Sequence, residues 1–271
     1  MSLTPESNLR MKKSDTPGGN RLKTLREFAG KTQLEVELDA SLGMGYLQRV
    51  ESGKVRHPER DTLERIVAAL GARYTERRDI LELFGYVVDA PLPNAEEIQW
   101  AIDACRAELR SAVFPAYLLD CAHQMVAWNA FVPKLYRLDP QAKRLSMLHI
   151  IFDPAYKVTP MIANPEEFFP AQIRALRYEM RLFRGEPWYG ALIDEMRHCE
   201  IFEKYWAQSE TQQAYYIPAR PLVPIELNLP VVGRLQFRLV SEQFAQDRRF
   251  RVIYLLPAEP RTMQQCLAWI D

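Results

Sequence analysis

Hydrophobic residues return every three or four positions from residue 20 to about residue 88, which is the spacing of amphipathic helices. Glycines interrupt the pattern at points where helices commonly end. The spacing predicts five short helices, and packing their apolar faces together gives a compact all-α domain. The interrupting glycines are Gly30, Gly53 and Gly71.

The rest of the chain mixes helical periods with short apolar runs. The runs predict strands over 116–119, 125–128, 225–229, 235–240 and 250–256. The periods predict helices over 98–112, 130–136, 144–151, 165–184, 191–198 and 200–209. Two strands, a helical middle and three strands imply an antiparallel sheet with helices packed on one face. The fold class predicted for the whole chain is α+β.

Composition divides the chain into four segments. Residues 1–19 contain prolines and glycines among polar residues, and we expect them to form a flexible N-terminal arm. The helical domain spans residues 20–90. Two closely spaced prolines mark a linker over residues 91–97, and the α+β domain takes residues 98–271.

The overall composition is that of an ordinary globular protein, with 48% hydrophobic and 26% charged residues. No apolar run approaches the ~18 residues that cross a bilayer, and the first residues lack the apolar core of a secretion signal. We therefore expect a cytoplasmic protein with no membrane partner. Basic and acidic residues balance at 35 each, yet the first 80 residues carry 15 basic and 12 acidic ones. A basic beginning favours contact with a polyanion.

Cysteine and histidine spacing argues against a metal centre. The four cysteines are scattered, and no two have C-x-x-C spacing. Cys121 with His123 and His198 with Cys199 are the nearest candidate ligand pairs, and each lacks a second well-spaced pair. No metal site is predicted.

A set of residues between 20 and 70 has the order of two helices joined by a tight turn. The set is Thr32-Gln33, Ala40, Leu42, Tyr46-Leu47, Arg49 to Lys54 and Thr62 to Ile66. With these residues the segment resembles the helix-turn-helix domain of the XRE/Cro-type repressors. Burial of the apolar members would hold the third helix outward, toward the major groove of an operator in double-stranded DNA.

The resemblance implies specific contacts with DNA. Positions matching Met44, Gly45 and Arg49 approach base edges in such repressors, and the position matching Gln33 caps the second helix and touches phosphate. Arg49 can bond to guanine O6 and N7, and Gln48 can read adenine if it faces the groove.

Cations beside this helix would bind the DNA backbone. Lys54 and Arg56 follow the third helix, where they would contact phosphate without reading sequence. Gly43 stands where these repressors usually have a capping serine or threonine, and Met44 offers only apolar contact. A helical bundle that mediates protein contacts is the alternative interpretation of this domain.

A second resemblance covers residues 115–260. It is carried by Pro115 to Asp120, Ala127-Trp128-Asn129, Leu148 to Pro154, Phe202 to Ala207, Val231-Val232-Gly233, Val252-Ile253-Tyr254 and Glu259-Pro260. In order and spacing these residues resemble the ligand-binding region of MmyB-like transcription regulators, a PAS-like fold. The resemblance implies a sensor that responds to a small molecule.

The helical middle of this region supplies candidate ligand contacts. Large apolar side chains are frequent there and would suit a hydrophobic ligand. Arg177 and Arg184 lie at the border of the apolar stripe on helix 171–184, where a guanidinium could bind a carboxylate. A fatty acid or acyl compound is the favoured ligand class, with no other cofactor. The apolar candidates are Leu148, Ile151, Phe152, Phe169, Met180 and Trp206.

These features together predict a transcription regulator that couples ligand binding to operator affinity, acting as a homodimer on paired half-sites. An enzyme acting on acyl compounds is one alternative, although the nucleophile, phosphate-loop and zinc-protease motifs are missing. A haem or flavin PAS sensor is another, with His123 and His149 as axial candidates.

Overall fold

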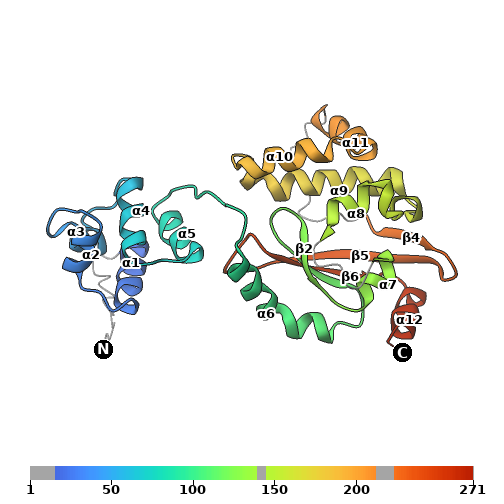
Figure 1. Cartoon of the computed structure of the whole chain (residues 1–271), viewed down its shortest axis with the longest axis horizontal. Coiled ribbons are helices and arrows are strands. Elements are labelled where there is room, and N and C mark those ends of the chain that lie inside the picture. The colour runs from blue at the N-terminus through green and yellow to red at the C-terminus, as the bar shows by residue number, and fades with distance from the viewer. Residues whose placement is uncertain (1–15, 139–144, 212–222, 271) are drawn as a thin grey trace, which may run out of the picture. The chain divides into compact units, whose positions relative to one another are not determined.

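Two compact units follow each other along the chain, residues 1–88 and residues 89–271. The computed structural model describes residues 16–138, 145–211 and 223–270 (Figure 1).

The first unit consists of helices, as the sequence predicts. They are α1 (Pro17–Phe28), α2 (Gln33–Asp39), α3 (Tyr46–Glu51), α4 (Arg60–Ala69) and α5 (Tyr74–Leu83). Their apolar faces meet in one core, in which Leu22, Val36, Leu47, Val50 and Leu63 are fully buried. The all-α prediction for this part of the chain is confirmed.

The first helix begins earlier than the sequence predicts. Thr16 caps α1 by accepting a hydrogen bond from the Gly19 amide at 3.1 Å. Gly19 is buried because it packs on the backbone of α3, where a Cβ would come within 2.6 Å of the Val50 carbonyl oxygen. The predicted arm over residues 1–19 is therefore too long, since its glycines serve close helix packing instead of a loop. Residues 1–15 lie outside the described part of the chain.

A buried ion pair ties three helices of this unit together. The Arg26 guanidinium on α1 donates to both carboxylate oxygens of Glu51 on α3, at 2.7 and 3.1 Å. It also donates to the Lys31 carbonyl, and Gln33 on α2 donates to Glu51 at 2.6 Å. Glu51 is 5% exposed, and its hydrogen bond raises the pKa of Arg26. The carboxylate therefore has three donors around it in a site with little water.

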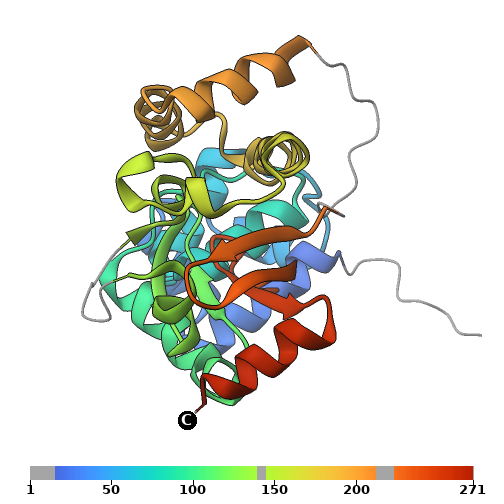
Figure 2. The same ribbon diagram turned by 90° about the vertical axis from the view of Figure 1, so that its right-hand side faces the viewer.

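The second unit contains one antiparallel sheet of six strands. They are β1 (Ala116–Leu119), β2 (Gln124–Trp128), β3 (Leu145–Ser146), β4 (Ile225–Leu229), β5 (Gly233–Gln243) and β6 (Arg251–Pro257). Their order across the sheet is β3-β2-β1-β6-β5-β4 (Figure 2). The predicted strands are confirmed, and the two-residue β3 is an addition because it is too short to show a period.

Helices of this unit surround the sheet. They are α6 (Ala95–Ser111), α7 (Phe131–Tyr136), α8 (Met147–Phe152), α9 (Pro165–Glu179), α10 (Pro187–Met196), α11 (Glu200–Thr211) and α12 (Pro260–Ala268). The predicted helix over 165–184 ends at Glu179 and continues as a 3₁₀ turn over Met180–Phe183. Helix α12 is not among the helices predicted from the sequence.

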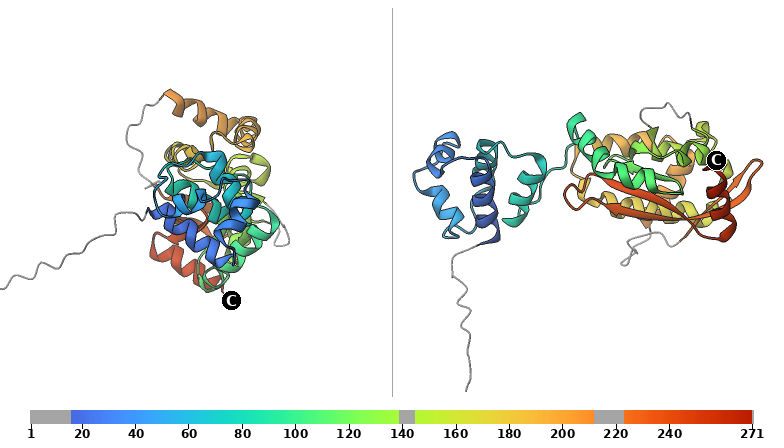
Figure 3. Two further views of the ribbon diagram at one scale, coloured as in Figure 1. Left: turned by 90° about the vertical axis from the view of Figure 1, so that its left-hand side faces the viewer. Right: turned by 90° about the horizontal axis from the view of Figure 1, so that it is seen from below.

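Both faces of the sheet are covered, which corrects the prediction of helices on one face. Ala101 and Cys105 of α6 pack on Ala116 and Leu118 of β1. The neighbouring residue Tyr117 points to the opposite face, where α8 and α9 lie. Figure 1 shows α6 on one side of the sheet and α8 to α11 on the other, and Figure 3 gives two further views of the same chain. Coverage on both sides explains why every residue of β1 is buried.

The linker is shorter than the predicted 91–97. Asn94 accepts a hydrogen bond from the Glu97 amide and caps α6, which begins at Ala95. The Ala90 amide donates to the Glu186 carboxylate, and the Trp188 indole donates to the Ala90 carbonyl at 2.9 Å. The chain is thus fastened to the second unit before α6 starts.

A buried arginine adds to this anchor. Arg249, 2% exposed, follows β5 and donates to the Pro91 carbonyl at 3.2 Å. It also pairs with Asp247 and Glu97, each at 2.8 Å. One side chain thereby joins the linker, the start of α6 and the turn before β6.

Glu51→Ala should destabilise the first unit strongly. The substitution leaves the Arg26 guanidinium buried without its carboxylate, which costs about 3–5 kcal/mol in comparable sites. Urea unfolding of the full chain measures the change. Lys23→Ala removes an exposed pair with Glu27 and should change the free energy of unfolding by less than about 1 kcal/mol. Equal effects of the two substitutions would contradict a stabilising role for the buried pair.

Candidate functional site

The turn between α2 and α3 is held by a buried carboxylate. Glu37 of α2, 5% exposed, accepts hydrogen bonds from the backbone amides of Gly45 at 3.0 Å and Leu47 at 2.8 Å. Gly45 is the N-cap residue of α3 and has a left-handed backbone, with φ of 73°. Glu37 therefore does for this helix what a capping serine does elsewhere. The expected cap position at Gly43 is wrong, since Gly43 lies in the turn.

Most of the predicted DNA-contact residues lie on the surface at this point. Gly43, Gln48 and Arg49 are exposed, Met44 is 84% exposed, and Gly45 is half-buried. The Arg49 guanidinium lies over the Tyr46 ring, with its carbon 5.6 Å from the ring centre. Lys54 and Arg56 are exposed in the segment after α3. An edge with polar, cationic and apolar groups is thus available to a partner.

Gln33 does not cap α2 as expected. Thr32 is the cap residue: its hydroxyl accepts from the Glu35 amide, and the Glu35 carboxylate accepts from the Thr32 amide at 2.7 Å. The Gln33 side chain turns to Glu51 instead. A phosphate contact by Gln33 stays a prediction.

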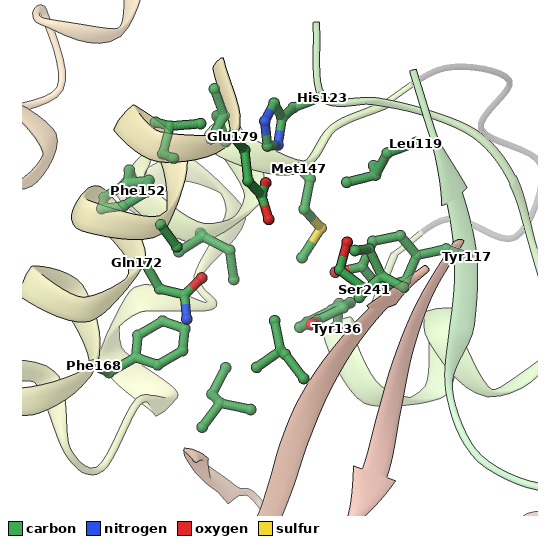
Figure 4. A pocket seen from close by; sticks show the side chains of 17 residues that line it. Tyr117, Leu119, His123, Tyr136, Met147, Phe152, Phe168, Gln172, Glu179 and Ser241 are labelled. Atoms are coloured by element: carbon green, nitrogen blue, oxygen red, sulfur yellow. The ribbon is translucent and has the colours of Figure 1, made fainter. Parts of the chain in front are cut away.

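The second unit contains a cavity of about 90 Å³ between the sheet and its helices, partly open to the surface (Figure 4). Strand residues from β1, β4, β5 and β6 form one wall, and residues of α7, α8 and α9 form the others. Three predicted ligand residues, Leu148, Ile151 and Phe152, line it. The cavity lining is mainly apolar, with a few polar groups among the carbon atoms.

The other apolar candidates lie outside the lining. Phe169 packs behind it, between Phe152 at 5.3 Å and Tyr205 at 5.5 Å. Trp206 stacks on Phe202 of the same helix, and Met180 is fully buried but is not part of the cavity wall. Phe169 and Trp206 belong to a layer of aromatic side chains that joins α8, α9 and α11.

Neither predicted arginine reaches the cavity. Arg177 donates to the Ser209 hydroxyl and the Trp206 carbonyl, and its guanidinium lies 3.7 Å from the Trp206 ring centre. Arg177 thus fastens α9 to α11. Arg184 is exposed at the end of the 3₁₀ turn. The helix period correctly places Arg177 at the border of the apolar stripe of α9. It does not show that α11 covers α9 at this position.

Six polar side chains that the sequence analysis did not select also face the cavity. They are Tyr117, His123, Tyr136, Gln172, Glu179 and Ser241. A hydrogen bond joins the hydroxyls of Tyr117 and Tyr136, and burial raises the pKa of both. The Glu179 carboxylate forms an ion pair with Arg251 of β6. The alternation of β1 gives a signal for Tyr117, whereas the other five depend on contacts distant in sequence.

His123 is held in an unusual position between β1 and β2. Its backbone is left-handed, with φ of 59°, and its side chain is 7% exposed. The pKa of His123 lies well below its ordinary value of 6.5. Burial is the larger cause, and the nearby Arg251 cation is the smaller one. The imidazole is therefore neutral in the folded protein at neutral pH.

The described residues contain neither a cluster of metal-ligating side chains nor a membrane-spanning helix. Within residues 16–138, 145–211 and 223–270, no group of three or more His, Cys, Asp or Glu side chains could hold a metal ion. All four cysteines are free thiols. No helix in the same ranges is long and apolar enough to span a bilayer.

Acid should destabilise the protein partly through His123. Its pKa is lower in the folded than in the unfolded state, so the unfolded chain takes up the proton first and stability falls as the pH drops below about 6.5. Replacing the side chain by His123→Leu should remove up to about 2 kcal/mol of the loss between pH 6.5 and 5. Denaturant unfolding across this range measures how steeply the free energy of unfolding changes with pH. Equal slopes for the wild type and His123→Leu would show that His123 does not contribute.

Comparison with known families agrees with both parts of the structure. Residues 19–80 match a helix-turn-helix domain, and residues 104–267 match the MmyB-like transcription regulator ligand binding domain. The cavity-lining residues all lie within the second match. A comparison with curated proteins gave no match. Since the ligand-binding model covers more than half of the chain, this protein belongs to the family of MmyB-like transcription regulators.

Proposed function

We propose that this DNA-binding transcription regulator changes its affinity for an operator when a small, mainly apolar ligand enters the cavity of the second unit. The cavity is the observation that carries the proposal. It lies inside the domain whose family binds ligands, and its walls are mostly apolar with a few polar groups. Such a site suits a small organic molecule.

The helix-turn-helix supplies the operator contacts in this proposal. Arg49 is exposed and aligned along Tyr46, which favours a bidentate bond to guanine. Met44 is available for a thymine methyl group. Lys54 and Arg56 are placed to bind phosphates beside the groove. We propose a homodimer, because operator half-sites about one helical turn (~34 Å) apart require two related recognition helices.

Acyl compounds remain candidates for the apolar part of the ligand. Leu148, Ile151 and Phe152 form an apolar wall, which supports an acyl group. The rationale for a carboxylate is weaker, because Arg177 and Arg184 do not line the cavity. A fatty acid would have to bind without them.

We further propose that the domain binds its ligand without converting it and without a resident cofactor. A thiol nucleophile needs a low pKa. Burial instead raises the pKa of the Cys121 thiol to about 12 and those of Cys105 and Cys266 to about 11. The cysteines are therefore suited to packing rather than to nucleophilic attack.

The effect of ligand binding can be passed to the linker through the helices next to the cavity. The chain at Ala90 is bonded to Glu186 and Trp188, and Trp188 packs on Phe183 of the 3₁₀ turn that follows α9. α9 itself contributes Gln172 to the cavity wall. Ligand binding changes operator affinity only if the ligand prefers one of two such arrangements.

Arg49→Ala should weaken operator binding by about 1–3 kcal/mol and relax the preference at one base pair, because a base contact is lost. Lys54→Ala should weaken binding to all sequences alike and reduce its salt dependence. Binding to the region upstream of its own gene, and selection from random sequences, measure both effects. Arg106→Ala, on α6 of the second unit, is the control. Unchanged affinity and preference in Arg49→Ala would disprove the groove contact.

Filling the cavity should remove the response to ligand. Ala175 on α9 lines the cavity, and Ala175→Phe places a ring where the ligand would bind. Ala191→Phe, at an exposed position of α10, is the matched control. Organic extraction with mass spectrometry, and melting temperatures with a panel of acyl compounds, compare both with the wild type. A bound ligand at about 100 times its Kd stabilises by about 2.7 kcal/mol.

Two results would contradict the proposed function. The first is that extraction yields no bound compound and no member of the panel raises the melting temperature. The second is that Ala175→Phe still binds the compound and still changes operator affinity in response to it.

A further inference from the structure

Two polar groups on the cavity wall lack protein partners. Within the described part of the chain, Nε2 of His123 and the amide nitrogen of Gln172 are buried and have no hydrogen-bond partner. His123 belongs to the turn between β1 and β2, and Gln172 belongs to α9. Figure 4 shows both side chains at the cavity, on different walls. Buried polar groups normally have partners, so two orphans on one cavity indicate that a ligand supplies them.

The charges around the cavity already balance. Glu179 is the carboxylate that faces it, and its partner is Arg251, whose side chain is 4% exposed. His123 is neutral there for the reason given above. An anionic ligand would therefore meet the Glu179 carboxylate, while the neighbouring Arg251 cation already forms an ion pair with that carboxylate and does not line the cavity. Burying a charge without a partner is costly.

Size restricts the ligand as well. The cavity of about 90 Å³ is smaller than the ~150 Å³ apolar cavity that accommodates benzene in another protein. Because the cavity is partly open, a short chain or a ring larger than this volume can extend through the opening. Met147 lies on the wall, and methionine adapts its shape readily.

Building on the proposed function, we propose that the ligand is a compact, uncharged molecule with an apolar body and a polar group such as an amide, ester, lactone or hydroxyl. The polar group accepts a hydrogen bond from the Gln172 amide nitrogen and forms a second one with Nε2 of His123. The apolar body lies against Leu148 and Ile151. Charge, size and the two orphaned groups favour this class over a free acid.

Matched pairs of probe compounds test whether the cavity prefers an uncharged ligand to an anionic one. Benzamide and benzoate have nearly the same shape, as do hexanamide and hexanoate, and the acids are ionised at pH 7.5. Calorimetry and melting temperatures with the full chain give the affinities. We expect each amide to bind at least tenfold more tightly than its acid. Ala175→Phe should abolish the binding of all four.

Gln172→Leu tests the recognition itself. The substitution keeps the volume but removes the amide donor, and it should weaken benzamide binding about five- to thirtyfold. Gln264→Leu, at an exposed position of α12, should leave the affinity unchanged. Without ligand, Gln172→Leu should raise the melting temperature, because an unpaired buried amide is replaced by an apolar group. A merely structural glutamine would show the opposite change.

The outcomes separate this inference from the proposed function. Tighter binding of the acids, blocked by Ala175→Phe, would overturn the uncharged class but keep the cavity as the ligand site. Failure of both amides to bind, or binding unaffected by Gln172→Leu, would also overturn it. Extraction of a bound compound that is absent from Ala175→Phe would then still support the proposed function.

Discussion

The pairing of β1 with β6 is the constraint on which the second unit depends. Leu118 lies opposite Val252 across more than 130 residues of sequence, and Tyr117 lies opposite Ile253. Because neighbouring strand residues point to opposite faces, this register sends Leu118 and Val252 to α6 and Tyr117 and Ile253 to the cavity. A shift by one residue would exchange the two sets and bring the Tyr117 hydroxyl into the α6 interface.

Local patterns predict most helices and strands correctly, because period and capping act over a few residues. Thr32 with Glu35 is such a case, and the structure confirms this capping box. Buried acids are harder to predict. Glu37 and Glu51 have ordinary helical positions in the sequence, and only the packing of other helices shows that they bind backbone amides and the Arg26 guanidinium.

The ligand site was predictable only in its local part. Leu148, Ile151 and Phe152 share one short helix, so their common wall follows from spacing. Arg177 was misinterpreted, because the helix period reveals a border but not that α11 covers it. Gln172 could not be recognised from the sequence, since its significance is the absence of a partner.

The segment at the start of β6 contacts both the cavity wall and the linker. Arg251 begins β6 and pairs with the cavity carboxylate Glu179, while Arg249, two residues earlier, binds the Pro91 carbonyl. Asp247 keeps Arg249 in place. A ligand that alters the Glu179–Arg251 pair would therefore act on the same short segment that anchors the linker. The Arg249–Asp247 pair in this segment is fully buried, and a partly separated buried pair is costly. The segment therefore favours two discrete arrangements over a gradual one.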